Sequence, residues 1–301
     1  MRVAATPRDG LGHAKRMMAL AAALRSLGAQ VSSPDLLSPN ANPMIRSSAE
    51  SLGVVADEAD VECVIFDSYR LGLGDELRER RVGRRVVVVD DLPIRAHSCD
   101  LLVDQNAREE AIPAYRSLTP VATELLLGPK YAMLGAEYRD ASRTKSPLQQ
   151  RSLRVLINWG GVAHTHLTDL AMTAIDCTGG VERGWSVETI EPSSPRVSMR
   201  EAWSSADLVI GAAGSSAWER VRLGVPSVVV VLAENQRAIA DHLDKLDLAI
   251  SVGVVSNLTL ERLAVAVDVA MRRVEAGLWI LPSGICDGLG AERVATAILR
   301  M

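Results

Sequence analysis

The feature that most constrains the fold of this chain is a regular alternation of short apolar runs with amphipathic segments. Strand-like runs stand at Arg2 to Ala5, Glu62 to Phe66, Arg85 to Val89, Leu101 to Val103, Arg154 to Asn158, Leu208 to Ile210 and Ser227 to Val231. Strands that alternate with helical segments form parallel sheets covered by helices. The sequence therefore predicts an α/β protein.

The length of the chain predicts two domains. Its 301 residues, 48% of them hydrophobic, suffice for two cores, because a single core stops growing at roughly 250 residues. The polar stretch from Tyr138 to Leu153 is typical of a linker. We expect Rossmann-like domains over residues 1–140 and 153–283, facing a cleft. Residues 284–301 should form a last helix, Ala291 to Leu299, that crosses back to the first domain.

Composition and charge exclude several classes of protein. The net charge of -4 argues against a nucleic-acid binder, which would carry a basic face. No stretch reaches the roughly 18 apolar residues of a membrane span, and the N-terminus lacks a leader pattern. The four cysteines form no C-x-x-C pair. We expect a soluble cytoplasmic protein with a small-molecule partner and neither nucleic acid nor stable membrane insertion.

A glycine-bearing loop after the first strand delivers Gly12 and His13 to the start of a helix. This position lies at the carboxyl edge of an open α/β sheet, where ligands bind. A helix N-terminus disfavours a protonated imidazole, so His13 suits the role of general base. The alternative, that His13 only caps the helix, is equally open from spacing alone.

Acidic residues follow two further strands. Asp67 and Tyr69 come just after one strand, and Asp90 and Asp91 just after another, so all of them should face the same edge as His13. For any single acid, capping of the next helix or a loop hydrogen bond is the interpretation favoured over catalysis.

In the second half, a strand runs into small residues and then a helix, between Gly211 and Arg220. A diphosphate can approach such a turn, and Glu219 can accept hydrogen bonds from ribose hydroxyls. The predicted nucleotide-binding residues are Gly211, Gly214, Ser215, Ser216 and Glu219. Alternatively, the small residues only let the helix pack closely on its strand. Asn235 and Gln236, after the next strand, either bind the sugar or cap a helix.

The histidines give little support for a metal site. His164 and His166 stand two apart, but no cysteine or further histidine is spaced to complete a set of ligands. We expect solvent-facing loop positions for both, and surface or helix positions for His97 and His242. The sequence predicts neither a metal nor a cofactor.

Eight motifs, in order along almost the whole chain, carry a resemblance to a known family. They are Gly12-His13-x-x-Arg16, Asp67-Ser68-Tyr69, Asp90-Asp91-Leu92, Cys99 to Asn106, Leu126 to Leu134, Gly211 to Arg220, Asn235-Gln236 and Asp287-Gly288-x-Gly290-Ala291-x-Arg293. The chain resembles the nucleotide-sugar hydrolases of pseudaminic acid biosynthesis, the UDP-2,4-diacetamido-2,4,6-trideoxy-beta-L-altropyranose hydrolases. Its glycine-rich parts also resemble GT-B glycosyltransferases that make peptidoglycan lipid intermediates.

The resemblance implies a GT-B-like fold and roles for particular residues. By matching position, His13 is the base that activates water and Tyr69 a residue near the sugar. Gly12 and Asp67 are the further predicted contacts of the substrate. Gly214, Ser215 and Glu219 would hold the nucleotide, and Asn235 and Gln236 the diphosphate or sugar. Two departures are a shorter opening loop, Thr6 to Leu11, and Val162-Ala163 in place of a polar pair.

The function predicted from these features is hydrolysis of a nucleoside-diphosphate sugar, expected to be UDP-linked. Water activated by His13 attacks the anomeric carbon and releases free sugar, with inversion, and the nucleoside diphosphate. One alternative is a glycosyltransferase that moves the sugar to an acceptor hydroxyl. Another is a nucleotide-sugar-binding subunit without catalytic activity.

Overall fold

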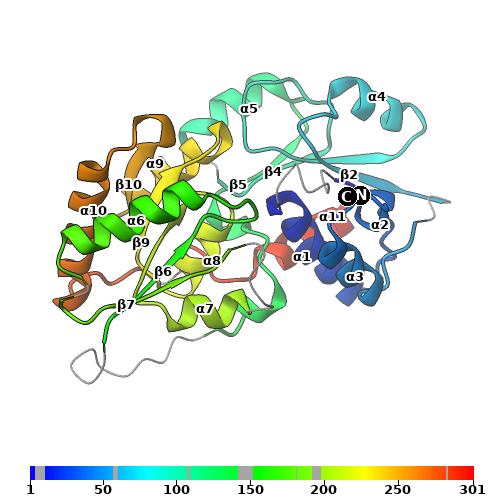
Figure 1. The fold of residues 1–301 in the computed structure, drawn as a ribbon. Helices are drawn as coiled ribbons and strands as arrows, with labels where there is room; N and C mark the ends of the chain where they lie inside the picture. Colours follow the sequence, from blue (N-terminus) through cyan, green and yellow to red (C-terminus); the bar gives the residue numbers. More distant parts are fainter. Residues whose placement is uncertain are drawn as a thin grey trace. The chain divides into compact units, whose positions relative to one another are not determined.

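The computed structural model describes residues 1–3, 11–56, 60–106, 109–141, 152–180, 182–191, 198–282 and 284–301. Most of the predicted linker and opening loop lies outside these ranges. The chain forms two compact units, Met1–Arg139 with Cys286–Met301, and Asp140–Ile285. Each unit contains one parallel sheet of five strands within its described residues (Figure 1). The predicted α/β class, with two parallel-sheet domains, is confirmed.

The sheet of the first unit runs in chain order. Its strands are β1 (Arg2–Val3), β2 (Cys63–Asp67), β3 (Arg85–Val89), β4 (Leu101–Asp104) and β5 (Glu124–Leu127). All pairs are parallel, with Val3 opposite Asp67 and Val89 opposite Val103. The carboxyl ends of these strands therefore meet at one edge, and the residues that follow them are brought together there.

Helices cover both faces of this sheet. They are α1 (Gly12–Ser26), α2 (Pro34–Leu37), α3 (Pro43–Ser51), α4 (Leu73–Arg81), α5 (Ile112–Leu118) and α11 (Gly290–Arg300). Ile65 and Val87 pack on the side of α1 and α11, whereas Val64 and Val86 pack on the side of α5 (Figure 1). The near-continuous apolar strands thus bury both faces, as a parallel sheet requires.

The C-terminal helix α11 packs against α1 inside the first unit. Its first residue, Gly290, lies so close to the short helix η3 (Pro129–Tyr131) that a Cβ there would stand 2.2 Å from the carbonyl oxygen of Ala132. A larger residue at this position would push α11 away from the sheet. Further 3-10 turns are η2 (Glu109–Ala111) and η4 (Ala136–Tyr138).

The second unit has a different strand order. Its strands are β6 (Arg154–Asn158), β7 (Ser186–Thr189), β8 (Leu208–Ala212), β9 (Ser227–Val231) and β10 (Ala249–Val254), all parallel in the order β10-β9-β8-β6-β7. Its helices are α6 (Thr165–Cys177), α7 (Met199–Ser205), α8 (Ser216–Arg222), α9 (Arg237–Lys245) and α10 (Leu260–Glu275), with short helices η6 (Glu234–Gln236) and η7 (Val255–Asn257).

Helices α6 and α10 share one core with alternate residues of β6, β8 and β9. Helices α7 and α9 contact the sheet without joining that core, and α7 packs on α8, so these helices cover the other face (Figure 1).

Several helices begin at a side chain that accepts a backbone N–H, as N-caps do; these are Ser33, Asn42, Ser198 and Thr259. No helix in the described ranges has the length and apolarity needed to cross a membrane.

The order of strands in the second unit reverses at β6. The chain passes from β6 to β7 on one side and then returns to β8 on the other side. After β6 the chain enters α6, and after β8 it enters α8 on the opposite face of the sheet. In open α/β sheets, ligands bind at the carboxyl ends of strands flanking such a reversal. The segments after Asn158 and Ala212 occupy that position.

Candidate functional site

The first unit places His13 beside Asp67 at the carboxyl edge of its sheet. Gly12 and His13 open α1, and Asp67 ends β2. Nδ1 of His13 lies 2.6 Å from Oδ1 of Asp67, and both residues are buried. Because an ionised carboxylate only accepts hydrogen bonds, we assign the ring proton to Nδ1 and its hydrogen bond to Asp67 rather than to the Arg16 nitrogen 3.0 Å away, which leaves Nε2 as the proton acceptor. This is the tautomer that a general base needs, and the side chain is committed to Asp67 rather than to capping α1.

Arg16, one turn further along α1, holds Asp67 from the other side. Its Nε and a terminal nitrogen donate to the two carboxylate oxygens at 2.8 and 2.5 Å, and its other terminal nitrogen donates to Asp91 at 3.2 Å. Burial alone would raise the pKa of Asp67, but Arg16 and His13 outweigh it and lower this pKa to about 2. Asp67 is therefore a permanent carboxylate that fixes the tautomer of His13.

Tyr69 and Asp91 complete what we call the His13 cluster, namely His13, Arg16, Asp67, Tyr69 and Asp91. The hydroxyl of Tyr69 donates to Asp91, and its ring meets His13 edge-on with centroids 5.0 Å apart. Tyr69 is 40% exposed, so the cluster reaches the protein surface there. Four of these residues, predicted from the sequence to face one edge of the sheet because they follow strands, are brought together there by the structure. Arg16 was named only as part of the Gly-His-x-x-Arg motif.

Asp90 and His97 belong to a second buried group. Asp90 follows β3 as predicted and accepts a hydrogen bond from the backbone N–H of Leu92 at 3.1 Å, the loop bond favoured for a single acid. His97, expected at the surface or on a helix, is instead buried in a loop, so that expectation was wrong. Nδ1 of His97 lies 2.7 Å from Glu76, and Nε2 lies 2.8 Å from Asp90. Burial lowers the pKa of His97, but bonds to Asp90 and Glu76 outweigh it and raise this pKa to about 9. His97 is therefore a buried cation between two carboxylates.

Glu76, Asp90, Arg95 and His97 form a group that we call the His97 network. Arg95 connects this network to the His13 cluster. Its Nε donates to Asp90 at 2.7 Å. Its terminal nitrogens donate to main-chain carbonyls of the loop after β2, at 3.2 Å to Ser68 and 3.4 Å to Tyr69. The network thus ties the loop that carries Tyr69 to the loop after β3, and so supports the cluster.

The pKa of His97 predicts how stability depends on pH. It rises from 6.5 to about 9 on folding, so the stabilisation is complete below pH 6.5 and is lost as the pH rises through 9. We expect this histidine to make the free energy of unfolding fall by roughly 3 kcal/mol across that window. Urea unfolding at pH 6, 7.5 and 9.5 measures the slope. Asp104, whose burial raises its pKa to about 7, titrates mostly below this range.

The variant His97→Gln should be less stable than wild type at pH 6 and should lack this contribution to the slope. His166→Gln, at an exposed position on α6, is the matched control and should keep the wild-type slope. An unchanged slope in folded His97→Gln would contradict the assignment of a buried, protonated His97.

In the second unit, the predicted nucleotide-binding residues occupy distinct positions. Gly211 lies within β8, where a Cβ would stand 2.1 Å from the carbonyl oxygen of Asn158 on β6. The neighbouring strand β6, rather than a helix, therefore requires a glycine at position 211. Gly214 and Ser215 form the turn after β8, and Ser216 begins α8; all three are half-buried.

Glu219 and Gln236 flank this turn. One carboxylate oxygen of Glu219 accepts a hydrogen bond from the indole nitrogen of buried Trp203 at 2.8 Å. Gln236 follows β9 beside Asn235, and its amide nitrogen lies 3.7 Å from where a Cβ on Gly214 would stand. Its amide oxygen accepts from the backbone of Leu232 at 2.9 Å. The segments after β8 and β9 therefore meet beside the point where the strand order reverses.

No metal site emerges from the described residues, in which no group of three histidine, cysteine or acidic side chains is placed to hold an ion. His166 is exposed on the first turn of α6, and His164 is half-buried just before that helix. Val162 and Ala163, the departures from the family pattern, are exposed in the preceding loop.

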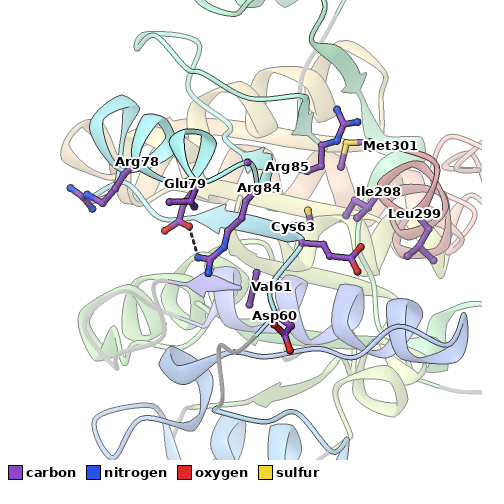
Figure 2. Close-up of a pocket in the computed structure, with 13 residues that line it drawn as sticks. Asp60, Val61, Cys63, Arg78, Glu79, Arg84, Arg85, Ile298, Leu299 and Met301 are labelled. Carbon is purple, nitrogen blue, oxygen red and sulfur yellow. Dashed lines mark hydrogen bonds and ion pairs between the residues drawn. The ribbon is translucent and has the colours of Figure 1, made fainter.

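A pocket of about 970 Å³ lies elsewhere in the first unit, at the amino ends of β2 and β3 (Figure 2). Cys63, Arg84, Arg85 and Met301 are among the residues that line it. It is at the opposite edge of the sheet from the His13 cluster, and its Arg84 is paired with Glu79 at 2.7 Å. This pocket therefore contributes nothing to the candidate chemistry.

Comparison with protein families and curated proteins agrees with the resemblance seen in the sequence. Residues 178–274 match the glycosyltransferase family 28 C-terminal domain. The chain is 29% identical over 143 residues to the UDP-2,4-diacetamido-2,4,6-trideoxy-beta-L-altropyranose hydrolase of Campylobacter jejuni. That match covers 45% of this chain and 52% of the relative, so the chain spans about half the length of the curated relative it matches. The resemblance is confirmed.

Solved structures share the fold over nearly the whole chain. MurG of Acinetobacter baumannii is similar with a TM-score of 0.63 and 17% identity, covering 96% of both chains. The MnaA protein of S. aureus, solved with UDP, has a TM-score of 0.59 and 11% identity, covering 95% of this chain and 93% of its own. The complex of LpCGTa with UDP has a TM-score of 0.57 and 15% identity, covering 95% and 96%. The GT-B-like fold is confirmed.

Proposed function

We propose that this chain is an enzyme that hydrolyses a nucleoside-diphosphate sugar, expected to be UDP-linked, at the anomeric carbon. The observation that carries the proposal is the buried His13–Asp67 pair, 2.6 Å apart, at the carboxyl edge of the first sheet. Two similarities support the choice of substrate: a relative named as a UDP-sugar hydrolase, and solved structures of the same fold that contain UDP.

In the proposed mechanism, Nε2 of His13 takes a proton from water as the water oxygen bonds to the anomeric carbon. The bond from that carbon to the diphosphate oxygen breaks, and the nucleoside diphosphate leaves with the electron pair. Asp67 stabilises the imidazolium that forms, as the acid of a catalytic triad does. Arg16 keeps Asp67 ionised, and Tyr69 is the proposed contact of the sugar. Attack from the face opposite the leaving group inverts the configuration.

The nucleotide is assigned to the second unit. The segments after β6 and β8 flank the reversal of strand order, the general position of ligands in open sheets. There, Gly214, Ser215 and Ser216 are the proposed contacts of the diphosphate, and Glu219 accepts from ribose hydroxyls. Asn235 and Gln236 follow the adjacent strand and are assigned to the diphosphate or sugar.

A panel of nucleotide sugars in ¹⁸O-labelled water, without an acceptor, tests this function. Release of free sugar carrying the label, together with unlabelled nucleoside diphosphate, supports attack at carbon. Label in the nucleotide would instead mean attack at phosphorus and overturn the role of His13. Binding without release would identify a non-catalytic subunit.

A glycosyltransferase is the second candidate, favoured by the match of residues 178–274 to a glycosyltransferase family domain. An acceptor hydroxyl would then replace water as the partner of His13. Release of nucleoside diphosphate that requires an added acceptor alcohol would favour this alternative over hydrolysis.

Glu219→Ala tests the nucleotide assignment. We expect the affinity for UDP to fall by about 1 to 3 kcal/mol, because bonds between ribose hydroxyls and a carboxylate are lost. The variant should also lose the preference for UDP over 2′-deoxy-UDP. Calorimetry measures both, and Glu201→Ala, at an exposed position on α7, is the control. Unchanged affinity in folded Glu219→Ala would remove Glu219 from the site.

A further inference from the structure

Arg220 on α8 is a fully buried arginine without an acidic partner in contact. It is 1% exposed. Its guanidinium donates to two uncharged oxygens, the carbonyl of Ala212 at 3.0 Å and the hydroxyl of Ser216 at 3.4 Å. Its Nε has no hydrogen-bond partner among the described residues, and Glu219 acts on the guanidinium through its charge without a hydrogen bond.

The comparison with Arg16 shows how unusual this arrangement is within one chain. Arg16 is equally buried, but Asp67 and Asp91 both contact it and its pKa is raised. Burial instead lowers the pKa of Arg220 to about 10, with Glu219 opposing this only in part. At neutral pH the guanidinium still carries its charge. A buried charge without a counter-charge in contact with it is strongly unfavourable, so such residues are usually paired.

The position of Arg220 indicates what could supply the missing charge. Ala212 is the last residue of β8, and Ser216 is the first residue of α8. The two hydrogen bonds therefore hold both ends of the turn that contains Gly214. The ring of Trp203 lies against the guanidinium, 5.5 Å from centroid to carbon. The charge is thus fixed behind the turn, where little water screens it.

We propose that Arg220 is the buried counter-charge for an anion bound at the turn from Gly214 to Ser216, namely the diphosphate of a nucleotide. This inference rests on the proposed function and deepens it. Arg220 acts as a positioning residue, because it fixes the two ends of the turn and stabilises the anion through the field of its charge without touching it. Affinity for the diphosphate, rather than for the nucleoside, is assigned to this side chain.

The experiment compares UDP, uridine and inorganic pyrophosphate as ligands of the full-length protein by calorimetry. Arg220→Met keeps most of the side-chain volume and removes the charge. We expect it to bind UDP and pyrophosphate about tenfold more weakly, the size expected for loss of one poorly screened charge, while uridine binds as to wild type. Arg222→Met, on the same helix and half-buried, is the control and should bind all three normally.

Arg220→Lys gives a readout that a packing role would not change. The lysine keeps the charge at pH 7, but burial lowers the pKa of a lysine ammonium. Its affinity for UDP should therefore decline between pH 7 and 9, whereas wild type, with a pKa of about 10 at Arg220, stays constant. This variant also serves if Arg220→Met does not fold.

The outcomes separate this inference from the proposed function. Equal weakening of uridine and UDP, or no pH dependence in a folded Arg220→Lys, would mean a structural role alone and overturn the inference. Arg220-dependent binding of pyrophosphate without binding of any nucleotide would leave the anion site standing and remove the proposed function. Binding of UDP that depends on Glu219 but not on Arg220 would overturn the inference about Arg220 and leave the proposed function standing.

Discussion

Replacing His13 with glutamine is expected to reduce turnover of the nucleotide sugar by roughly a hundred- to ten-thousand-fold, the usual contribution of a general base. The glutamine amide can still donate to Asp67, so the buried carboxylate keeps a partner in place of Nδ1. The affinity for UDP should stay at the wild-type value, because the nucleotide is assigned to residues of the second unit. Steady-state turnover and calorimetry together measure the two quantities.

His166→Gln is the matched control for this substitution. His166 is exposed on the first turn of α6 and is outside the proposed machinery, so its loss should change neither turnover nor affinity. Wild-type turnover in folded His13→Gln would mean that another group activates the nucleophile. A parallel loss of UDP affinity would mean that His13 contributes to binding rather than to proton transfer.

The fold was predictable in its centre and less so at the edges of the sheets. Inner strands such as β3 and β8 are buried on both faces, and their continuous apolar runs identify them. The three strands that the sequence did not reveal, β5, β7 and β10, all lie at sheet edges. The edge strand β7 alternates between exposed and half-buried residues, so it lacks a continuous apolar run. Because only one face of β7 is partly buried, its four residues carry only a weak hydrophobic pattern in the sequence.

The site was predictable where chain topology alone brings residues together. His13 and Asp67 are 54 residues apart, but both follow parallel strands that end at the same edge. His97 offered no such signal, because its environment depends on how α4 packs. Glu76, its partner on that helix, lies 21 residues earlier and in a run of charged residues that is typical of a solvated helix face. Sequence pattern cannot distinguish a buried acid from its exposed neighbours there.

Arg16→Met is expected to lower the free energy of unfolding at pH 7 by about 3 to 5 kcal/mol, the usual loss when one partner of a buried ion pair is removed. Arg16 and Asp67 are both buried, so the carboxylate left behind cannot be rehydrated. Arg46→Met is the control, because its pair with Glu50 is exposed and 3.9 Å long. Exposed pairs contribute at most about 1 kcal/mol. Urea unfolding at pH 7 measures the difference between the two variants.

The dependence on pH distinguishes loss of the ion pair from loss of packing. In wild type, the pKa of Asp67 is lowered from 3.8 to about 2, so its stabilisation is present above pH 4 and lost as the pH falls through 2. Without Arg16, burial raises this pKa and only His13 opposes it, so the folded variant favours the protonated acid. Its instability relative to wild type should therefore shrink as the pH falls from 7 towards 3. Arg46→Met should keep a constant difference. If the deficit of Arg16→Met is also constant with pH, the arginine stabilises the fold by packing, and Asp67 does not depend on it for its charge.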